Sequence, residues 1–146
     1  MWHLKSGWVW GVVLALCISP VLADPIKDDL DLARQTRAQQ VAQAAASLLE
    51  AFEPQLKSVA GTGDLDQLRA LLAQRDAFKA SKAVPDSEFM KPAAAGYSQS
   101  VKTADLTLAT AYEKAITAYV RAMRVDDAQA VREQLKQLQA SSSLAG

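Results

Sequence analysis

The feature that most constrains this chain is an apolar residue at every third or fourth position along most of residues 24–140. Such spacing places the apolar side chains on one face of an α-helix. No alternating run of β-branched residues occurs in this range, so no strand is predicted. Ala, Gln, Leu, Lys, Glu and Arg, which favour helices, dominate the composition. The sequence therefore predicts an all-α protein.

Two long helices are predicted, one over residues 26–60 and one over residues 92–123. Arg37 is the one charged residue on the apolar stripe of the first helix. Pro54 is expected to kink this helix near Glu50–Glu53 or to split it there. The first stripe is Ile26, Leu30, Ala33, Val41, Ala45, Leu48, Phe52, Leu56 and Val59, and the second is Tyr97, Val101, Ala104, Leu108, Tyr112, Ala115 or Ile116, Tyr119 and Met123.

Local turn signals end each long helix and open a shorter one. Gly61-Thr62-Gly63 is predicted to end the first helix. Asp64, with Gln67 three residues later, is typical of a capping box at the start of the next helix. A similar turn is expected at residues 123–127, with Asp126 as the candidate cap.

The connector between the two halves contains two prolines and no sustained period. We expect one short helical turn at Ser87–Met90, and Pro92 in the first turn of the third helix, where its missing N–H costs nothing. The predicted boundaries are hairpin one at residues 26–82, a connector at 83–91, hairpin two at 92–140 and a disordered tail at 141–146.

The two hairpins are similar to each other at an offset of 60 residues without a gap. The best matches pair Val41 with Val101, Leu48 with Leu108, Phe52-Glu53 with Tyr112-Glu113, Leu56 with Ile116, Asp66 with Asp126, Leu71 with Val131 and Gln74 with Gln134. Chance alignment of two amphipathic helices is the alternative. A duplication is favoured because the shared Asp falls at the start of the short helix in both copies. Two duplicated hairpins predict an elongated up-down four-helix bundle or an antiparallel coiled-coil-like array.

The shorter helices can cover only part of the longer ones, which leaves apolar surface exposed near Ala33–Ala45 and Tyr97–Ala104. Exposed apolar stripes of this kind are typical of self-association or of a protein partner. The candidate interaction face is Arg37, Val41, Tyr97 and Val101.

Residues 1–23 have the three parts of a secretory signal. Lys5 and the amino terminus form a positive region, and an apolar run follows from Gly7 to Ile18. Val21-Leu22-Ala23 then gives small or tolerated residues before a cut between Ala23 and Asp24. We expect export with cleavage after Ala23 and a periplasmic or secreted location, with no membrane span once the signal is removed; retention of the segment as an anchor is the alternative.

The signal segment also removes much of the chemistry that side chains offer. The only Cys, the only His and all three Trp lie within it, as Cys17, His3, Trp2, Trp8 and Trp10. Residues 24–146 therefore cannot build a Cys/His zinc site, a His-ligated haem, a disulfide or a His-based catalytic triad. No metal, cofactor or catalytic residue is predicted, and a balance of 16 basic and 16 acidic residues disfavours nucleic acid.

The remaining polar candidates have ordinary structural explanations. Asp28 and its acidic neighbours suit the start of a helix better than a calcium loop. Asp66 and Asp126 are explained by helix capping. Arg37 and Arg75 each interrupt an apolar stripe, and either can extend to solvent or pair with a carboxylate such as Glu50 or Asp105 on a neighbouring helix.

Leu48–Arg75 and Ala111–Leu138 share an aromatic-Glu helix that leads through an Asp-containing turn into an Ala/Val/Leu helix. Both segments resemble helical-hairpin repeats of exported proteins from planctomycete and verrucomicrobial bacteria. The first copy keeps Gly63-Asp64-Leu65-Asp66, whereas the second reads Met123-Arg124-Val125-Asp126. The resemblance implies a non-catalytic accessory or spacer role and brings no catalytic residues.

We therefore expect a non-enzymatic exported helical interaction or scaffolding protein that binds a protein partner or a second copy of itself. The alternative is a periplasmic chaperone-like or stress-response protein that holds unfolded clients. A small-molecule binder comes third and an enzyme last.

Overall fold

The computed structural model describes residues 23–144, which form four α-helices and one short 3-10 helix. The elements are α1 (Pro25–Thr62), α2 (Leu65–Ser81), η1 (Glu88–Met90), α3 (Lys91–Arg121) and α4 (Val125–Leu144). No strand occurs within residues 23–144, and the predicted all-α class is confirmed. The predicted signal, residues 1–23, lies outside the described residues apart from Ala23.

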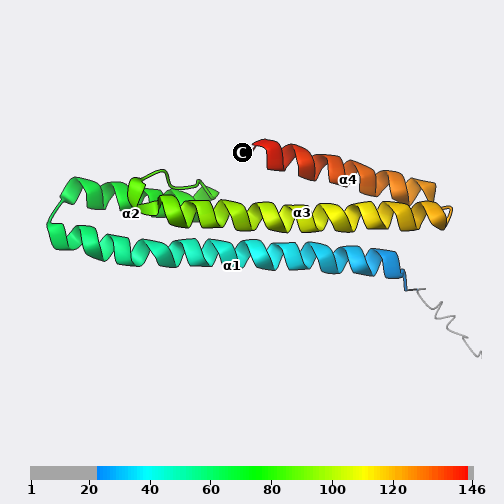
Figure 1. Cartoon of the computed structure of the whole chain (residues 1–146), viewed down its shortest axis with the longest axis horizontal. Helices are drawn as coiled ribbons and strands as arrows, with labels where there is room; N and C mark the ends of the chain where they lie inside the picture. The colour runs from blue at the N-terminus through cyan, green and yellow to red at the C-terminus, as the bar shows by residue number, and fades with distance from the viewer. Residues whose placement is uncertain (1–22, 145–146) are drawn as a thin grey trace, which may run out of the picture.

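The two long helices, α1 and α3, lie antiparallel and side by side, and they form the body of an elongated molecule (Figure 1). α2 packs on the C-terminal half of α1, and α4 packs on the C-terminal half of α3 at the opposite end. Within residues 23–144, α2 and α4 make no contact with each other. The bundle therefore has three helices at each end and only two in the middle.

This arrangement divides the core into two clusters. The first is Ala45, Leu48, Phe52, Leu56, Val59, Leu71, Phe78 and Met90. The second is Leu30, Leu108, Tyr112, Ala115, Tyr119, Ala128 and Val131. Between the clusters no residue of α1 from Asp31 to Ala44 is fully buried, and none of α3 from Ala95 to Thr103. The uncovered middle agrees with the sequence prediction, although Ala45 and Ala104, at its edges, are themselves buried.

Local contacts set the ends of the helices in the first hairpin, and the sequence predicted those at Gly63 and Asp64. The side chain of Asp24 accepts hydrogen bonds from the Ile26 and Lys27 amides at the start of α1. α1 ends at Gly63, which has a left-handed φ of 77°. Asp64 accepts a hydrogen bond of 3.0 Å from the Gln67 amide and caps α2.

The connector and the start of α3 also follow the prediction. η1 provides the short turn expected at Ser87–Met90, and Pro92 lies in the first turn of α3. Pro54, by contrast, lies inside a continuous α1, so the predicted split of this helix is wrong. Phe52 and Leu56, on either side of Pro54, are buried in the same cluster. We infer that this packing outweighs the one hydrogen bond that Pro54 cannot donate.

Hairpin two differs from the prediction at both ends of α4. Asp126 was predicted to cap α4 but is the second residue of that helix, and Asp66 is likewise the second residue of α2. Both carboxylates therefore lie in the first turn, where their negative charge interacts favourably with the helix dipole. Residues 141–144 of the predicted disordered tail are helical instead, because α4 continues to Leu144, and residues 145–146 lie outside the described residues. Met123, predicted to belong to the apolar stripe, is 85% exposed.

The offset of 60 residues relates positions that share burial as well as residue type. Leu48 and Leu108 are both buried, and so are Phe52 with Tyr112, Val59 with Tyr119, and Leu71 with Val131. Gly63 and Met123 both have a positive φ, at 77° and 60°. Each hairpin thus has a long and a short helix with matched buried positions; the duplication itself stays a prediction.

Candidate functional site

An apolar hollow lies along the seam between α1 and α3. Its volume is about 420 Å³. It is lined by Ile26, Asp29, Leu30, Leu32, Ala33, Thr36, Arg37 and Gln40 of α1, and by Ala104, Thr107, Leu108, Ala111, Lys114, Ala115 and Ala118 of α3. No residue of α2, η1 or α4 lines it, so this face of the helix pair is the one that the short helices leave open.

A second hollow of about 410 Å³ continues the first toward the middle of the molecule. The two share Gln40 and Ala104. Its lining is Gln40, Gln43, Ala44, Ser47, Gln99, Ser100, Thr103 and Ala104. At the offset of 60 residues, Gln40, Gln43 and Ala44 correspond to Ser100, Thr103 and Ala104, so matching positions of α1 and α3 line most of this hollow. We call the two together the α1–α3 groove.

The chemistry of the α1–α3 groove changes along its length. The end toward the start of α1 is apolar and has small side chains on α3, including Ala111, Ala115 and Ala118. The central part has only amide, hydroxyl and methyl groups. From Ile26 to Ser47 the groove extends about 32 Å at the rise of an α-helix. That length and the small lining residues allow a helix to lie close against it.

Charged side chains stand at the edges of the groove. Asp29 of α1 and Lys114 of α3 are both exposed and line its apolar end. Arg37 lies deeper, and its Nε donates to Asp105 Oδ1 at 2.5 Å. Asp105 is 8% exposed and also accepts a hydrogen bond of 2.8 Å from Ser142 of α4. The contact therefore joins α1, α3 and α4, and it holds the Arg37 side chain in the groove.

Arg34 makes a second contact between three helices on the side of α4. It donates to Asp31, to the Tyr112 hydroxyl and to Gln134 of α4, and its guanidinium lies 5.6 Å from the centre of the Tyr112 ring. The hydrogen bond to Tyr112 raises the pKa of Arg34 above its ordinary value, despite partial desolvation. All of these donors have partners within the protein, so this contact is structural.

The structure separates the four residues of the predicted interaction face. Arg37 lines the α1–α3 groove, whereas Tyr97 packs edge-on against Phe78 of α2, with ring centres 5.1 Å apart. Val41 and Val101 are half-buried. Each is one turn from the Arg37–Asp105 contact in antiparallel helices, so they lie at the same level in the uncovered middle. Neither lines the groove.

Of the two pairing alternatives for the stripe arginines, the structure selects Asp105 for Arg37. Nη1 of Arg75 lies 3.8 Å from Oε1 of Glu53, so Arg75 pairs with this carboxylate and not with Glu50. The burial of Asp105 is the main site feature that sequence reasoning missed. Asp105 follows Val101 by four residues and precedes Leu108 by three, so the helical period itself indicated that it faces the core.

Within residues 23–144, no group of three or more His, Cys, Asp or Glu side chains is arranged to hold a metal ion. None of the described helices combines the length and the apolar character that crossing a membrane requires. Comparison with protein-family models, with curated proteins and with solved structures gave no match.

Proposed function

We propose that this chain is a non-enzymatic, exported interaction protein whose α1–α3 groove binds a helix of a protein partner. The observation that carries the proposal is the groove itself, a long apolar seam lined by two helices and left open by the other two. A partner helix on this seam would be the fourth helix at the end where α1, α3 and α4 already pack together, and it would complete a four-helix bundle there.

The export part of the proposal depends on residues 1–23. A positive start, an apolar run and small residues before Asp24 are typical of a secretory signal. We propose cleavage after Ala23, which leaves Asp24 free to cap α1.

The lining indicates what kind of helix would bind. Alanine and threonine side chains leave room for large apolar residues from the partner, at the spacing of an amphipathic helix. Asp29 and Lys114 stand on opposite helices at the apolar end of the groove. We therefore expect the partner helix to present a basic residue toward α1 and an acidic residue toward α3.

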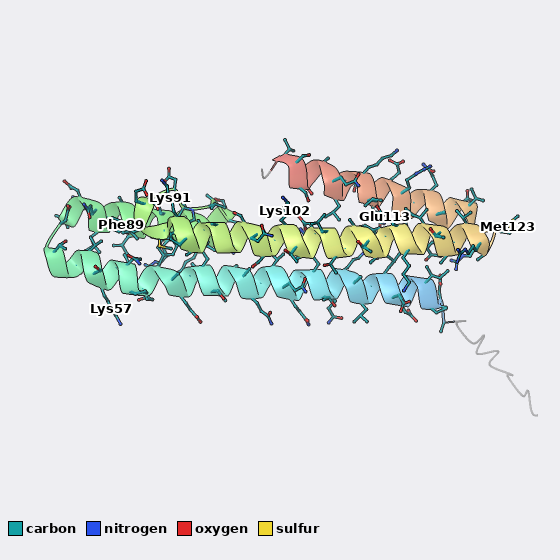
Figure 2. The ribbon with its side chains drawn as sticks, in the orientation of Figure 1. Lys57, Phe89, Lys91, Lys102, Glu113 and Met123 are labelled. Atoms are coloured by element: carbon teal, nitrogen blue, oxygen red, sulfur yellow. The ribbon has the colours of Figure 1, made fainter. Side chains whose placement is uncertain are left out.

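Site-specific photo-crosslinking in the native cell envelope tests this proposal. A photoreactive residue at Thr107, in the groove, is compared with one at Glu113, which is exposed on α3 and outside the groove (Figure 2). We expect one dominant, saturable partner to be captured at position 107 and not at 113. Ala111→Glu, which puts a charge into the groove, should abolish the capture.

The other outcomes each replace the proposal with a different function. A broad set of envelope proteins captured at position 107, together with suppressed aggregation of several unfolded clients, would favour a chaperone. Capture of the protein's own chain alone would favour self-association. Equal capture at positions 107 and 113 would overturn the groove as the binding site.

A further inference from the structure

The turn between α3 and α4 carries three exposed apolar side chains. Val120 is 53% exposed, Met123 85% and Val125 65%. We call these three residues the apolar tip. Met123 lies at the extreme end of the long axis of the molecule (Figure 2). The apolar tip is thus separate from the α1–α3 groove, which has none of these residues in its lining.

Met123 holds an unfavourable backbone conformation at this turn. Its φ is 60°, and its amide and that of Arg124 donate to the carbonyls of Val120 and Tyr119. This is the hydrogen-bond pattern that usually ends on a glycine. The equivalent position in hairpin one is indeed a glycine, Gly63. A methionine here is strained, and at 85% exposure its side chain adds little to the core.

The apolar tip lies next to the point where residues 1–22 join the described chain. Nη1 of Arg124 lies 2.8 Å from Oδ2 of Asp24, and Nε of Arg124 lies 2.7 Å from Oδ2 of Asp127. These contacts hold the α3–α4 turn against the start of α1, and Ala23 directly precedes it. Figures 1 and 2 show both features at the same end of the molecule.

The sequence that precedes Ala23 favours a lipid bilayer as the surface that this end of the molecule contacts. Residues 7–22 are apolar apart from Ser19, and residues of this kind partition into a bilayer. We propose that, in the uncleaved chain, this segment enters a bilayer and Val120, Met123 and Val125 insert into the outer part of that bilayer, so that this end of the molecule stands on the membrane until cleavage after Ala23. The inference uses the export segment of the proposed function but not the groove.

The charges around the apolar tip indicate which interaction would bind it to a bilayer. Arg121 and Arg124 are opposed by Asp24, Asp126 and Asp127, so the end of the molecule has no excess of basic residues. Attraction to anionic lipid is therefore not the source of the contact, and the apolar side chains are. Insertion should be the same in neutral and in anionic vesicles.

A fluorophore on the full chain tests the proposal. In a Cys17→Ser background, Met123→Cys is labelled with an environment-sensitive dye, and the protein is added to phosphatidylcholine vesicles that contain a shallow nitroxide lipid. The control is Leu65→Cys, which is 55% exposed at the equivalent turn of hairpin one. We expect a blue shift and quenching at position 123 at least about twofold stronger than at position 65.

Insertion must also be distinguished from mere nearness to the bilayer. Val120→Asp with Val125→Asp should remove the blue shift and the excess quenching at position 123 while the chain still floats with the vesicles. Phosphatidylglycerol should not change the signal. A signal that survives both aspartates, or that requires anionic lipid, would overturn apolar insertion.

Three further outcomes would reject the proposal. These are equal signals at positions 123 and 65, a full chain that does not float with vesicles, and a probe at position 123 that becomes shielded only when envelope proteins are added. The last would assign the tip to a protein partner instead. Failure of the crosslinking at Thr107 would leave the tip proposal untouched, because that experiment tests only the groove.

Discussion

Arg37 of α1 and Asp105 of α3 form an ion pair of 2.5 Å at the level where α4 ends beside the two long helices. Ser142 of α4 donates to the second oxygen of the same carboxylate. At the offset of 60 residues, the counterparts of Arg37 and Asp105 are Tyr97 and Ala45, and Tyr97 packs against the cluster that contains Ala45. A polar pair of residues and an apolar pair of residues therefore occupy equivalent positions.

Removing one partner of this pair should cost more than replacing both. We expect Arg37→Ala to lower the free energy of unfolding by about 1–2 kcal/mol, because Asp105 keeps its burial but loses its cation. The double variant Arg37→Tyr with Asp105→Ala copies the apolar counterpart and should lie within about 1 kcal/mol of the parent. Urea denaturation compares the parent, Arg37→Ala, the double variant and its two singles, Arg37→Tyr and Asp105→Ala, with the exposed Lys102→Ala as control. A double variant that loses as much as the sum of its singles would contradict the equivalence.

The two core clusters should respond alike to a buried charge. Leu48 is 2% exposed in the first cluster and Leu108 is 5% exposed in the second. We expect Leu48→Asp or Leu108→Asp to abolish cooperative unfolding, because each buries an unpaired carboxylate as well as losing apolar contact. Asp29→Ala, at an exposed site, should change stability by less than about 0.5 kcal/mol. Circular dichroism follows each transition, and neutral results at both leucines would refute the core assignment.

Much of the fold follows from local rules that a sequence displays directly. The helical period identifies Leu48, Phe52 and Leu108 as core because side chains three or four residues apart share a helix face. Gly63 and Asp64 identify the first turn because each forms a hydrogen bond with the backbone of a residue only three positions away. These features needed no knowledge of where other helices lie.

The parts that the sequence did not predict depend on contacts between helices. α4 continues to Leu144, where a disordered tail was expected, and Ser142 reaches Asp105 across 37 residues of chain. The α1–α3 groove exists because α2 and α4 both leave that seam open, which a stripe of apolar residues does not specify. For Arg37 the sequence left solvent, Glu50 and Asp105 open, and only packing chose Asp105.

Exchange of Met123 for glycine should stabilise the protein. Glycine adopts the φ of 60° without strain, so we expect Met123→Gly to raise the free energy of unfolding by about 0.5–1 kcal/mol. Gly63→Ala is the matched opposite: a Cβ there meets no atom within 4 Å, so its expected loss of about 1 kcal/mol reports backbone conformation alone. Thermal unfolding of both variants measures the difference. A loss of stability in Met123→Gly would mean that the methionine side chain packs more than its exposure indicates.

The contact between Asp24 and Arg124 should make stability depend on acid pH. Partial burial opposes ionisation of Asp24, but hydrogen bonds from Arg124 and from the Lys27 and Ile26 amides outweigh it, and its pKa is lowered. A carboxyl group whose pKa is lower in the folded state stabilises the fold above its ordinary value of 3.8. That stabilisation is lost as the pH falls through the lower, folded value. We therefore expect the urea concentration at the midpoint of unfolding to decrease as the pH is lowered below about 4. Asp24→Asn should make this decrease smaller.

Arg124→Ala provides the matched test of the same contact. Because Arg124 donates the side-chain hydrogen bond that lowers the pKa of Asp24, its removal should also flatten the acid decline. The double variant Asp24→Asn with Arg124→Ala should then add little to either single change. Asp31 is the reason for a remaining slope, because hydrogen bonds from Lys27 and Arg34 lower its pKa too. An acid decline identical in the parent and in all three variants would show that the α3–α4 turn is not held to the start of α1 by this ion pair.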